Sequence, residues 1–284
     1  MSVTIAASVP DALAALAGGD AHVLAGGTDL MVEVNHGLRR PEAIVAVGRI
    51  PELRTWSIDG GMLRIGAAVT YTEMLASSFA AAASALSEAA RTVGSPQIRN
   101  AGTIGGNVAT ASPAGDTLPV LVALEATVEL VAPGGTRHVP LAELITGPKR
   151  TTIAAGELVT AVTVETGPHL TQEYLKVGTR NAMVIAAASC AVVVDVTARS
   201  VRVGLGSVGP VPLRAPEAEA WVASRLTWDG SGLAEDLAGE FGRRVSAEAR
   251  PIDDHRSTAA YRRHAVGVLA ARGLRRAFIQ AIAA

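Results

Sequence analysis

The sequence predicts an α+β protein built from three consecutive blocks, at residues 1–55, 56–167 and 168–284. The first two blocks alternate short strand-like and helix-like segments, whereas the third places its strands before its helices, an order typical of α+β domains. At 284 residues with 49% hydrophobic composition, the chain can bury a substantial core. We therefore expect an ordered, multi-layered protein.

The first block is expected to form a small α/β unit. A helix at 11–17 is favoured by Asp11 at its start, because an acidic residue stabilises a helix N-terminus. Glycines at 18 and 19 end it. The further elements expected are a strand at 22–25, a helix at 30–36 and a strand at 43–47.

The second block mixes alanine-rich and glycine-rich stretches. Thr72 is a plausible N-cap for a short helix at 73–76, and an alanine-rich helix is expected at 79–93 before Gly94. A polar, glycine-rich segment follows at 95–115. The other elements expected are a strand at 62–65, a helix at 118–124, and strands at 127–131 and 158–164.

The third block is the most regular. Three apolar runs with strand character come first, and three segments with helical spacing follow. The strands are expected at 172–177, 188–196 and 200–206, and the helices at 216–224, 232–247 and 257–281.

Composition narrows the functional classes. The net charge of -1 gives no global field for nucleic acid, so no nucleic-acid partner is expected. The single cysteine, Cys190, excludes an internal disulfide and an iron–sulfur cluster held by this chain's thiolates. No apolar run is long enough for a transmembrane segment, and we expect a cytoplasmic protein. The six histidines show no metal-ligand spacing, so no metal site is expected.

Two glycine-containing segments carry most of the chemical signal. The first, 25–30, follows a strand and opens a helix, and the second, 103–107, lies in the polar segment ahead of Asp116. Glycines allow close approach of a ligand, and successive N–H groups at a helix start can bind phosphate. Each segment alone also fits a tight turn or a bulge. Both together favour one diphosphate-containing ligand gripped from two subdomains.

These segments, with 111–116 after the second, resemble the FAD-binding medium subunit of molybdenum hydroxylases of the xanthine dehydrogenase and carbon monoxide dehydrogenase kind. Residues 176–180, 251–254 and 257–262 resemble that family's C-terminal flavoprotein domain. The resemblance covers essentially the whole chain. It implies a two-subdomain FAD-binding fold of the PCMH type, which is vanillyl-alcohol-oxidase-like, followed by a C-terminal α+β domain.

The resemblance also implies which residues contact FAD. The two glycine turns would bind the diphosphate through backbone N–H groups, Val93 would contact the flavin, and Leu158 would contact the adenine side. Val184 stands where the family often has an aspartate, so polar contacts near it are not expected. The complete implied set is Leu24, Ala25, Gly26, Gly27, Thr28, Asp29, Leu30, Val93, Thr103, Ile104, Gly105, Gly106, Asn107, Asp116, Leu158 and Lys176.

The function implied by the resemblance is electron transfer in a flavoprotein oxidoreductase subunit. A large partner subunit would hold molybdopterin, and a small partner would carry 2Fe–2S clusters, in a dimer of heterotrimers. Electrons would reach FAD from the clusters and leave to an external acceptor, with no catalytic acid or base from this chain. A free-standing flavin oxidase of the same fold and a cofactor-free assembly protein are the alternatives.

A further glycine pattern, 204–209, matches the dinucleotide motif G-x-G-x-x-G after a strand. Pro210 and Pro212 follow at once and disfavour a helix start there. We expect a strand-end turn instead.

Overall fold

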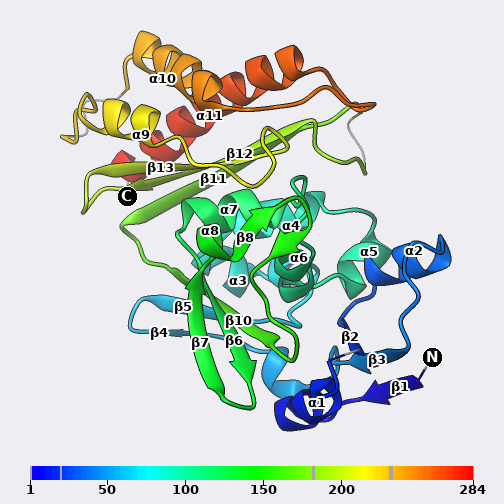
Figure 1. The fold of residues 1–284 in the computed structure, drawn as a ribbon. Helices are drawn as coiled ribbons and strands as arrows, with labels where there is room; N and C mark the ends of the chain where they lie inside the picture. Colours follow the sequence, from blue (N-terminus) through cyan, green and yellow to red (C-terminus); the bar gives the residue numbers. More distant parts are fainter. Residues whose placement is uncertain (1, 20, 181–182, 230–232, 284) are drawn as a thin grey trace.

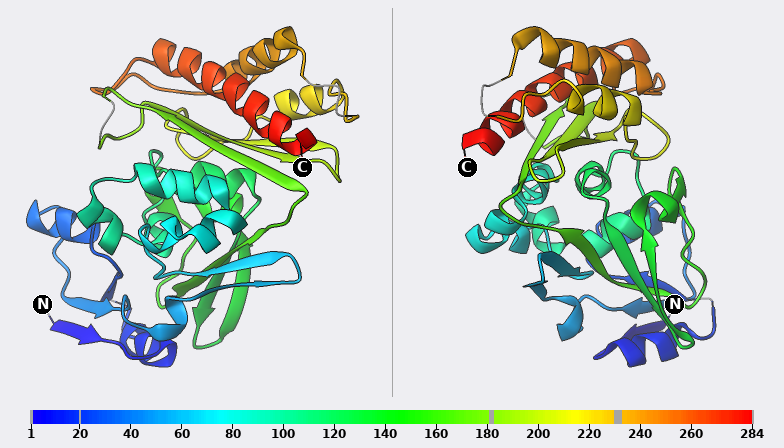
Figure 2. Two further views of the ribbon diagram at one scale, coloured as in Figure 1. Left: turned by 180° about the vertical axis from the view of Figure 1, so that it is seen from behind. Right: turned by 90° about the vertical axis from the view of Figure 1, so that its left-hand side faces the viewer.

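The computed structural model describes residues 2–19, 21–180, 183–229 and 233–283, and it stacks the three blocks in chain order (Figure 1). The first block lies at one end and the third covers the other, so the two termini lie far apart (Figure 2). The α+β class is confirmed. Within the described ranges, no helix is both long enough and apolar enough to cross a bilayer.

The first block is a parallel sheet in the order β1-β3-β2, with α1 against it. Helix α1 begins after Ser8, whose Oγ accepts a hydrogen bond from the Asp11 amide. Leu13 and Leu16 of this helix pack with Val45 of β3 in a small core. The elements are β1 (Ser2–Ile5), α1 (Val9–Leu16), β2 (Ala21–Leu24), α2 (Leu30–Asn35), β3 (Ala43–Ala46) and a 3-10 turn at Pro51–Leu53.

The second block is an antiparallel sheet in the order β4-β5-β10-β6-β7 with short helices over it. Ile65 and Val162 of the sheet share one core with Leu86 and Leu121 of the helices. Its strands are β4 (Trp56–Asp59), β5 (Met62–Gly66), β6 (Thr127–Ala132), β7 (Gly135–Pro140), β8 (Ile145–Gly147), β9 (Arg150–Thr151) and β10 (Leu158–Glu165). Its helices are α3 (Ser77–Ala82), α4 (Ser84–Thr92), α5 (Pro96–Ala101), α6 (Ile104–Thr110), α7 (Thr117–Ala123), α8 (Leu141–Leu144) and a 3-10 turn at Glu73–Leu75.

The third block is a three-stranded antiparallel sheet, β11-β12-β13, covered by helices on both faces (Figure 1). Helices α9 and α11 cover one face, α10 packs on these two helices, and all three share a core with Val192 of β12. Helices α4 and α7 of the second block meet the other face, where Val193 joins the core of that block. Burial from both sides explains the unbroken apolar run of β12. The elements are β11 (Leu170–Val177), β12 (Ala188–Asp195), β13 (Ser200–Gly206), α9 (Pro216–Ala223), α10 (Glu235–Glu248) and α11 (Ala259–Ala283).

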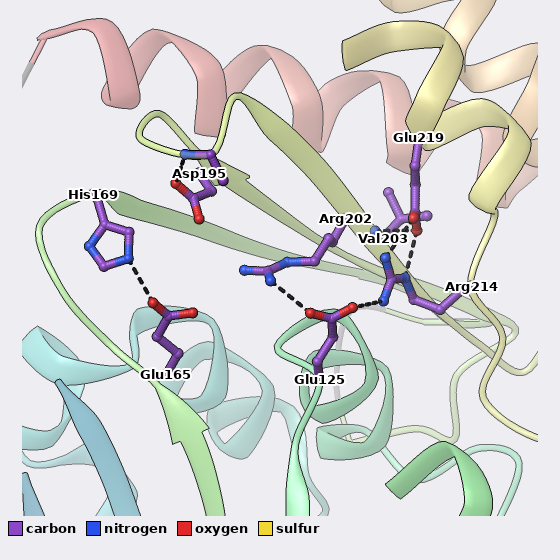
Figure 3. A network of polar contacts seen from close by, with 9 residues as sticks. Glu125, Glu165, His169, Asp195, Arg202, Val203, Arg214 and Glu219 are labelled. Carbon is purple, nitrogen blue, oxygen red and sulfur yellow. Dashed lines mark hydrogen bonds and ion pairs between the residues drawn. The ribbon is translucent and has the colours of Figure 1, made fainter. Parts of the chain in front are cut away.

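A polar network ties the second block to the third (Figure 3). Glu125, just after α7, pairs with Arg202 of β13 at 2.9 Å and with Arg214 at 3.0 Å. Arg214 also pairs with Glu219 of α9 at 2.6 Å, and Glu219 accepts a hydrogen bond from the Val203 amide. Ion pairs between Glu125 of the second block and two arginines of the third therefore connect these blocks. The predicted division of the chain into three domains stays a prediction.

The helices of the second block differ from what the sequence predicted. The helix expected at 79–93 is broken at Ala83, and the freed carbonyl of Ala82 accepts a hydrogen bond from the Thr166 hydroxyl instead. Thr72 occupies the N-cap position of the 3-10 turn at Glu73–Leu75, but its hydroxyl donates to Asn100 instead of capping the turn. In both cases a contact with a residue far along the chain replaces the local one. The polar segment at 95–115, where no helix was expected, contains α5 and α6.

Cys190 lies wholly buried in β12, and burial raises the pKa of its thiol. Because the thiolate is the reactive form, we expect a thiol-specific disulfide reagent to leave the native protein unmodified. After denaturation the same reagent should release one equivalent of its chromophore, which absorbance measures. Native-state reaction as fast as that of the denatured chain would contradict the buried placement.

A cofactor-sized groove between the blocks

Two pockets meet where the three blocks come together. A narrow pocket of about 300 Å³ lies between the first and second blocks. A wide pocket of about 1160 Å³ extends to the third block. Both are lined by Thr28, Asp29, Tyr71, Asn107 and Lys149, so they form one continuous groove. Such a shape suits an elongated ligand with one end in each pocket.

The first glycine turn forms one wall of the narrow pocket. It links the end of β2 to the start of α2, and Gly27 has φ +71, a conformation that favours glycine. At Gly26 a Cβ would lie 1.8 Å from the Ala101 oxygen, so this glycine allows the turn to touch α5. Among the described residues, no acceptor is found for the amides of Gly26 to Asp29. Unpaired amides beside a pocket suit an anionic ligand.

The second glycine turn is the first turn of helix α6. Thr103 is its N-cap, and the Thr103 Oγ1 accepts a hydrogen bond from the Gly106 amide at 3.1 Å. The amides of Ile104, Gly105 and Asn107 also donate within the chain, at 2.9–3.1 Å. The sequence predicted free amides here, and this prediction is wrong, because Val69, Ala67 and Thr103 already accept their hydrogen bonds.

The two glycines of this turn have different roles. At Gly105 a Cβ would lie 2.5 Å from the Ala67 Cβ, so the position is closed by packing against the chain after β5. At Gly106 a Cβ would meet only the Thr103 Oγ1, at 3.0 Å, and Gly106 lines the narrow pocket. The lack of a side chain at Gly106 therefore leaves space for a ligand, whereas at Gly105 it allows α6 to pack against Ala67.

Asp116 and Lys176 form a buried ion pair beside the wide pocket. The Lys176 Nζ lies 2.8 Å from the Asp116 Oδ2, and the two side chains are 8% and 10% exposed. The Tyr174 hydroxyl donates to the Asp116 Oδ1 at 2.9 Å. Burial raises the pKa of Asp116, and the Lys176 ammonium counters part of that rise. The pair joins the start of α7 to β11, on either side of the junction between blocks.

The structure brings most of the residues implied for FAD binding to this groove. Val93 and Asp116 line the wide pocket. Ile104 lines neither pocket because its side chain is wholly buried in the core. Lys176 lines neither pocket and contacts the groove residue Asp116. Residues lining the narrow pocket are Leu24, Ala25, Gly26, Gly27, Thr28, Asp29, Leu30, Thr103, Gly105, Gly106, Asn107 and Leu158. Their contacts with FAD stay a prediction.

Several groove residues carry no recognisable sequence signal. Tyr71, 5% exposed, lines both pockets, and burial raises the pKa of its hydroxyl. Lys149 and Glu33 come together from the β8–β9 turn and α2, at 2.8 Å. Sequence spacing gives no hint of either position, because each depends on the docking of one block on another.

The C-terminal block contributes cationic residues to the wide pocket. Arg262, near the start of α11, is only 4% exposed and pairs with Asp254 at 2.6 Å. Arg250 and Arg256 also line this pocket. The 204–209 pattern ends β13 as a turn, and the next helix starts only at Pro216. Across the described part of the chain, no cluster of three His, Cys, Asp or Glu residues could hold a metal ion.

Two family models of known proteins match this chain, one over its N-terminal part and one over its C-terminal part. Residues 1–165 match the family model described as the FAD binding domain in molybdopterin dehydrogenase. Residues 173–277 match the model for the CO dehydrogenase flavoprotein C-terminal domain.

Two named relatives cover 93% and 75% of the chain. The glyceraldehyde dehydrogenase medium chain of Sulfolobus acidocaldarius is 34% identical over 269 residues, which is 93% of each chain. The xanthine dehydrogenase FAD-binding subunit of Escherichia coli O157:H7 is 32% identical over 222 residues, 75% of this chain and 76% of that one. A solved structure of Cu,Mo-CO dehydrogenase superposes with a TM-score of 0.89 at 30% identity over 99% of each chain. The chain therefore belongs to the family of FAD-binding medium subunits of molybdenum hydroxylases, oxidoreductase subunits of the xanthine and carbon monoxide dehydrogenase kind.

Proposed function

We propose that this chain is the electron-transfer subunit of a molybdenum hydroxylase complex, placed between the 2Fe–2S clusters of a partner subunit and an external acceptor. The observation that carries the proposal is the continuous groove, whose narrow and wide pockets share five residues. A bound FAD would supply the chemistry, since a flavin can accept electrons singly and release them in pairs. The chain itself would bind and orient the cofactor.

The residues present fit FAD. The narrow pocket, lined by Gly106 and Leu158, would take the adenosine end, and the wide pocket would take the larger flavin end. The unpaired amides of the first glycine turn would face the diphosphate near the junction. Val93 and Asp116 would then lie near the flavin end. None of these groups needs to act as a general acid or base.

The relatives support a multi-subunit setting, because several are named as medium chains or FAD subunits of dehydrogenases. We propose a large partner holding molybdopterin, a small partner holding the 2Fe–2S clusters, and assembly as a dimer of heterotrimers. A cytoplasmic location is part of the same proposal. The substrate would be chosen by the large subunit.

Cofactor content and electron flow test this proposal together. The full chain, purified alone and with its co-expressed partners, should contain FAD equimolar with the chain by absorbance after release. In the complex, stripping FAD should stop electron delivery to an external dye while cluster reduction by dithionite, followed by electron paramagnetic resonance, persists. A well-folded chain that never takes up FAD would overturn the proposal. Dye reduction with a small substrate by the isolated chain would instead favour a free-standing oxidase.

A further inference from the structure

Lys149 stands where the two pockets meet. Among the five residues that line both pockets, it carries the only positive charge, and Asp29 carries the only negative one. In FAD the diphosphate lies between the adenosine and the ribityl-flavin. A FAD molecule that spans both pockets would therefore bring its two phosphates to this junction, beside Lys149.

The backbone of Lys149 is firmly held. It forms the turn between β8 and β9 with φ +54, which is uncommon for a residue other than glycine. Its amide donates to the Ala111 oxygen at 3.0 Å, and Ala111 ends helix α6 in the same left-handed conformation, at φ +48. Unfavourable backbone conformations of this kind cluster at ligand sites. The Cα of Lys149 is thus fixed against α6, while its side chain is 57% exposed.

The ammonium of Lys149 pairs with the Glu33 carboxylate, which also pairs with the guanidinium of Arg39. Glu33 of α2 accepts from the Lys149 Nζ at 2.8 Å through Oε1 and from the Arg39 Nε at 2.9 Å through Oε2. Lys149 and, to a smaller extent, Arg39 lower the pKa of Glu33, so it remains a carboxylate. If Lys149 turned toward another anion, Arg39 would still neutralise Glu33. Exposed ion pairs add little to stability, so this exchange would disturb the fold little.

We propose that Lys149 is a ligand of the FAD diphosphate, and that Glu33 holds its ammonium in the apoprotein and competes with the phosphates for it. This inference rests on the proposed FAD-binding function. A hydrogen bond from a charged ammonium to a phosphate is stronger than one from a neutral donor. Lysine suits the exchange because its three ammonium donors sit on a flexible four-carbon stem.

Substitutions on the two sides of the pair should act in opposite directions. Lys149→Met should raise the Kd for FAD about tenfold, the usual effect of losing one charged hydrogen bond. Lys149→Arg keeps the charge and should lose less affinity. Glu33→Gln releases Lys149 and should lower the Kd by about twofold to threefold. Arg150→Met is the matched control, because Arg150 is exposed on the same hairpin and lines neither pocket; its Kd should stay unchanged.

Lysine acetylation provides a second, independent measurement. Lys149 and Lys176 are the only lysines in the chain, and Lys176 is 8% exposed. Brief treatment of the apoprotein with acetic anhydride should therefore modify Lys149, as measured by mass spectrometry of its peptide. FAD should protect it, and ADP should protect it as well because ADP carries the same diphosphate.

The outcomes separate the inference from the function on which it rests. If the wild-type chain binds no FAD, the proposed function fails. If the wild type binds FAD but Lys149→Met binds it equally well, or Lys149 is acetylated at the same rate with and without FAD, the inference fails alone. Equal weakening by Lys149→Met and Glu33→Gln would also overturn it, because that result indicates a purely structural link between α2 and the hairpin.

Discussion

Gly106→Val should produce a folded protein that binds FAD much more weakly. The Cβ at this position meets only the Thr103 Oγ1, at 3.0 Å, and otherwise projects into the narrow pocket. A branched side chain there would occupy space proposed for the cofactor. Overpacking of this kind costs about 1–3 kcal/mol, so the Kd for FAD should rise about tenfold to a hundredfold or more, as measured by fluorescence titration.

Gly239→Val is the matched control for this prediction. Gly239 is also a helical glycine with space around it, on α10, where a Cβ would approach nothing closer than the Arg243 Nη1 at 3.8 Å. It lines neither pocket, and its variant should retain FAD. Unchanged FAD affinity in Gly106→Val, with circular dichroism showing native helix content, would contradict the role given to this glycine.

Lys176→Met should be strongly destabilising. It leaves the Asp116 carboxylate buried with the Tyr174 hydroxyl but without a cation, and the Lys176 and Asp116 side chains are only 8% and 10% exposed. Breaking a buried pair from one side typically costs about 3–5 kcal/mol of unfolding free energy. Urea denaturation of the apoprotein measures this loss without any contribution from the cofactor.

The pH dependence of this variant has a definite sign. Burial raises the pKa of Asp116, and Lys176 is the largest influence that lowers it, so the substitution raises that pKa further. A group whose pKa is raised in the folded state stabilises it at low pH and loses that contribution as the pH rises through the folded value. The deficit of Lys176→Met should therefore shrink as the pH falls and Asp116 becomes protonated.

A double variant completes the test of the buried pair. Lys176→Met with Asp116→Asn removes the unpaired charge, so it should recover part of the stability lost in the single variant. No recovery in the double variant, or a deficit that grows as the pH falls, would show that charge burial is not the cause.

Local sequence signals predicted most elements because those signals act over a few residues. The apolar run at β12 and the turn that ends β13 depend on short-range patterning. The first helix was expected to start at Asp11, and the structure starts it two residues earlier, at Val9. The helix expected at 79–93 failed for a different reason. Alanine-rich spacing continues through Ala83, but the break depends on Thr166, far along the chain, which binds the carbonyl of Ala82.

In the candidate site too, the sequence predicted local features but not contacts between distant segments. Glycine turns at 25–30 and 103–107 could be recognised because a close approach needs glycine wherever it occurs. The sequence could not distinguish Gly105, closed by Ala67, from Gly106, open to the pocket, because the difference lies in what each position faces. It could not indicate Lys149 either, since its position in the groove depends on a hairpin docked on α6.

The sequence by itself determined the α+β class, the order of strands and helices in the third block, and the two glycine turns that identify the family. Each of these depends on residue type and local spacing, which the chain carries without folding. Only the tertiary structure decided which amides remain unpaired, which glycine gives room to a ligand, and that Asp116 meets Lys176 across the junction between blocks. Those properties are contacts between distant segments, and they exist only once the three blocks have been packed together.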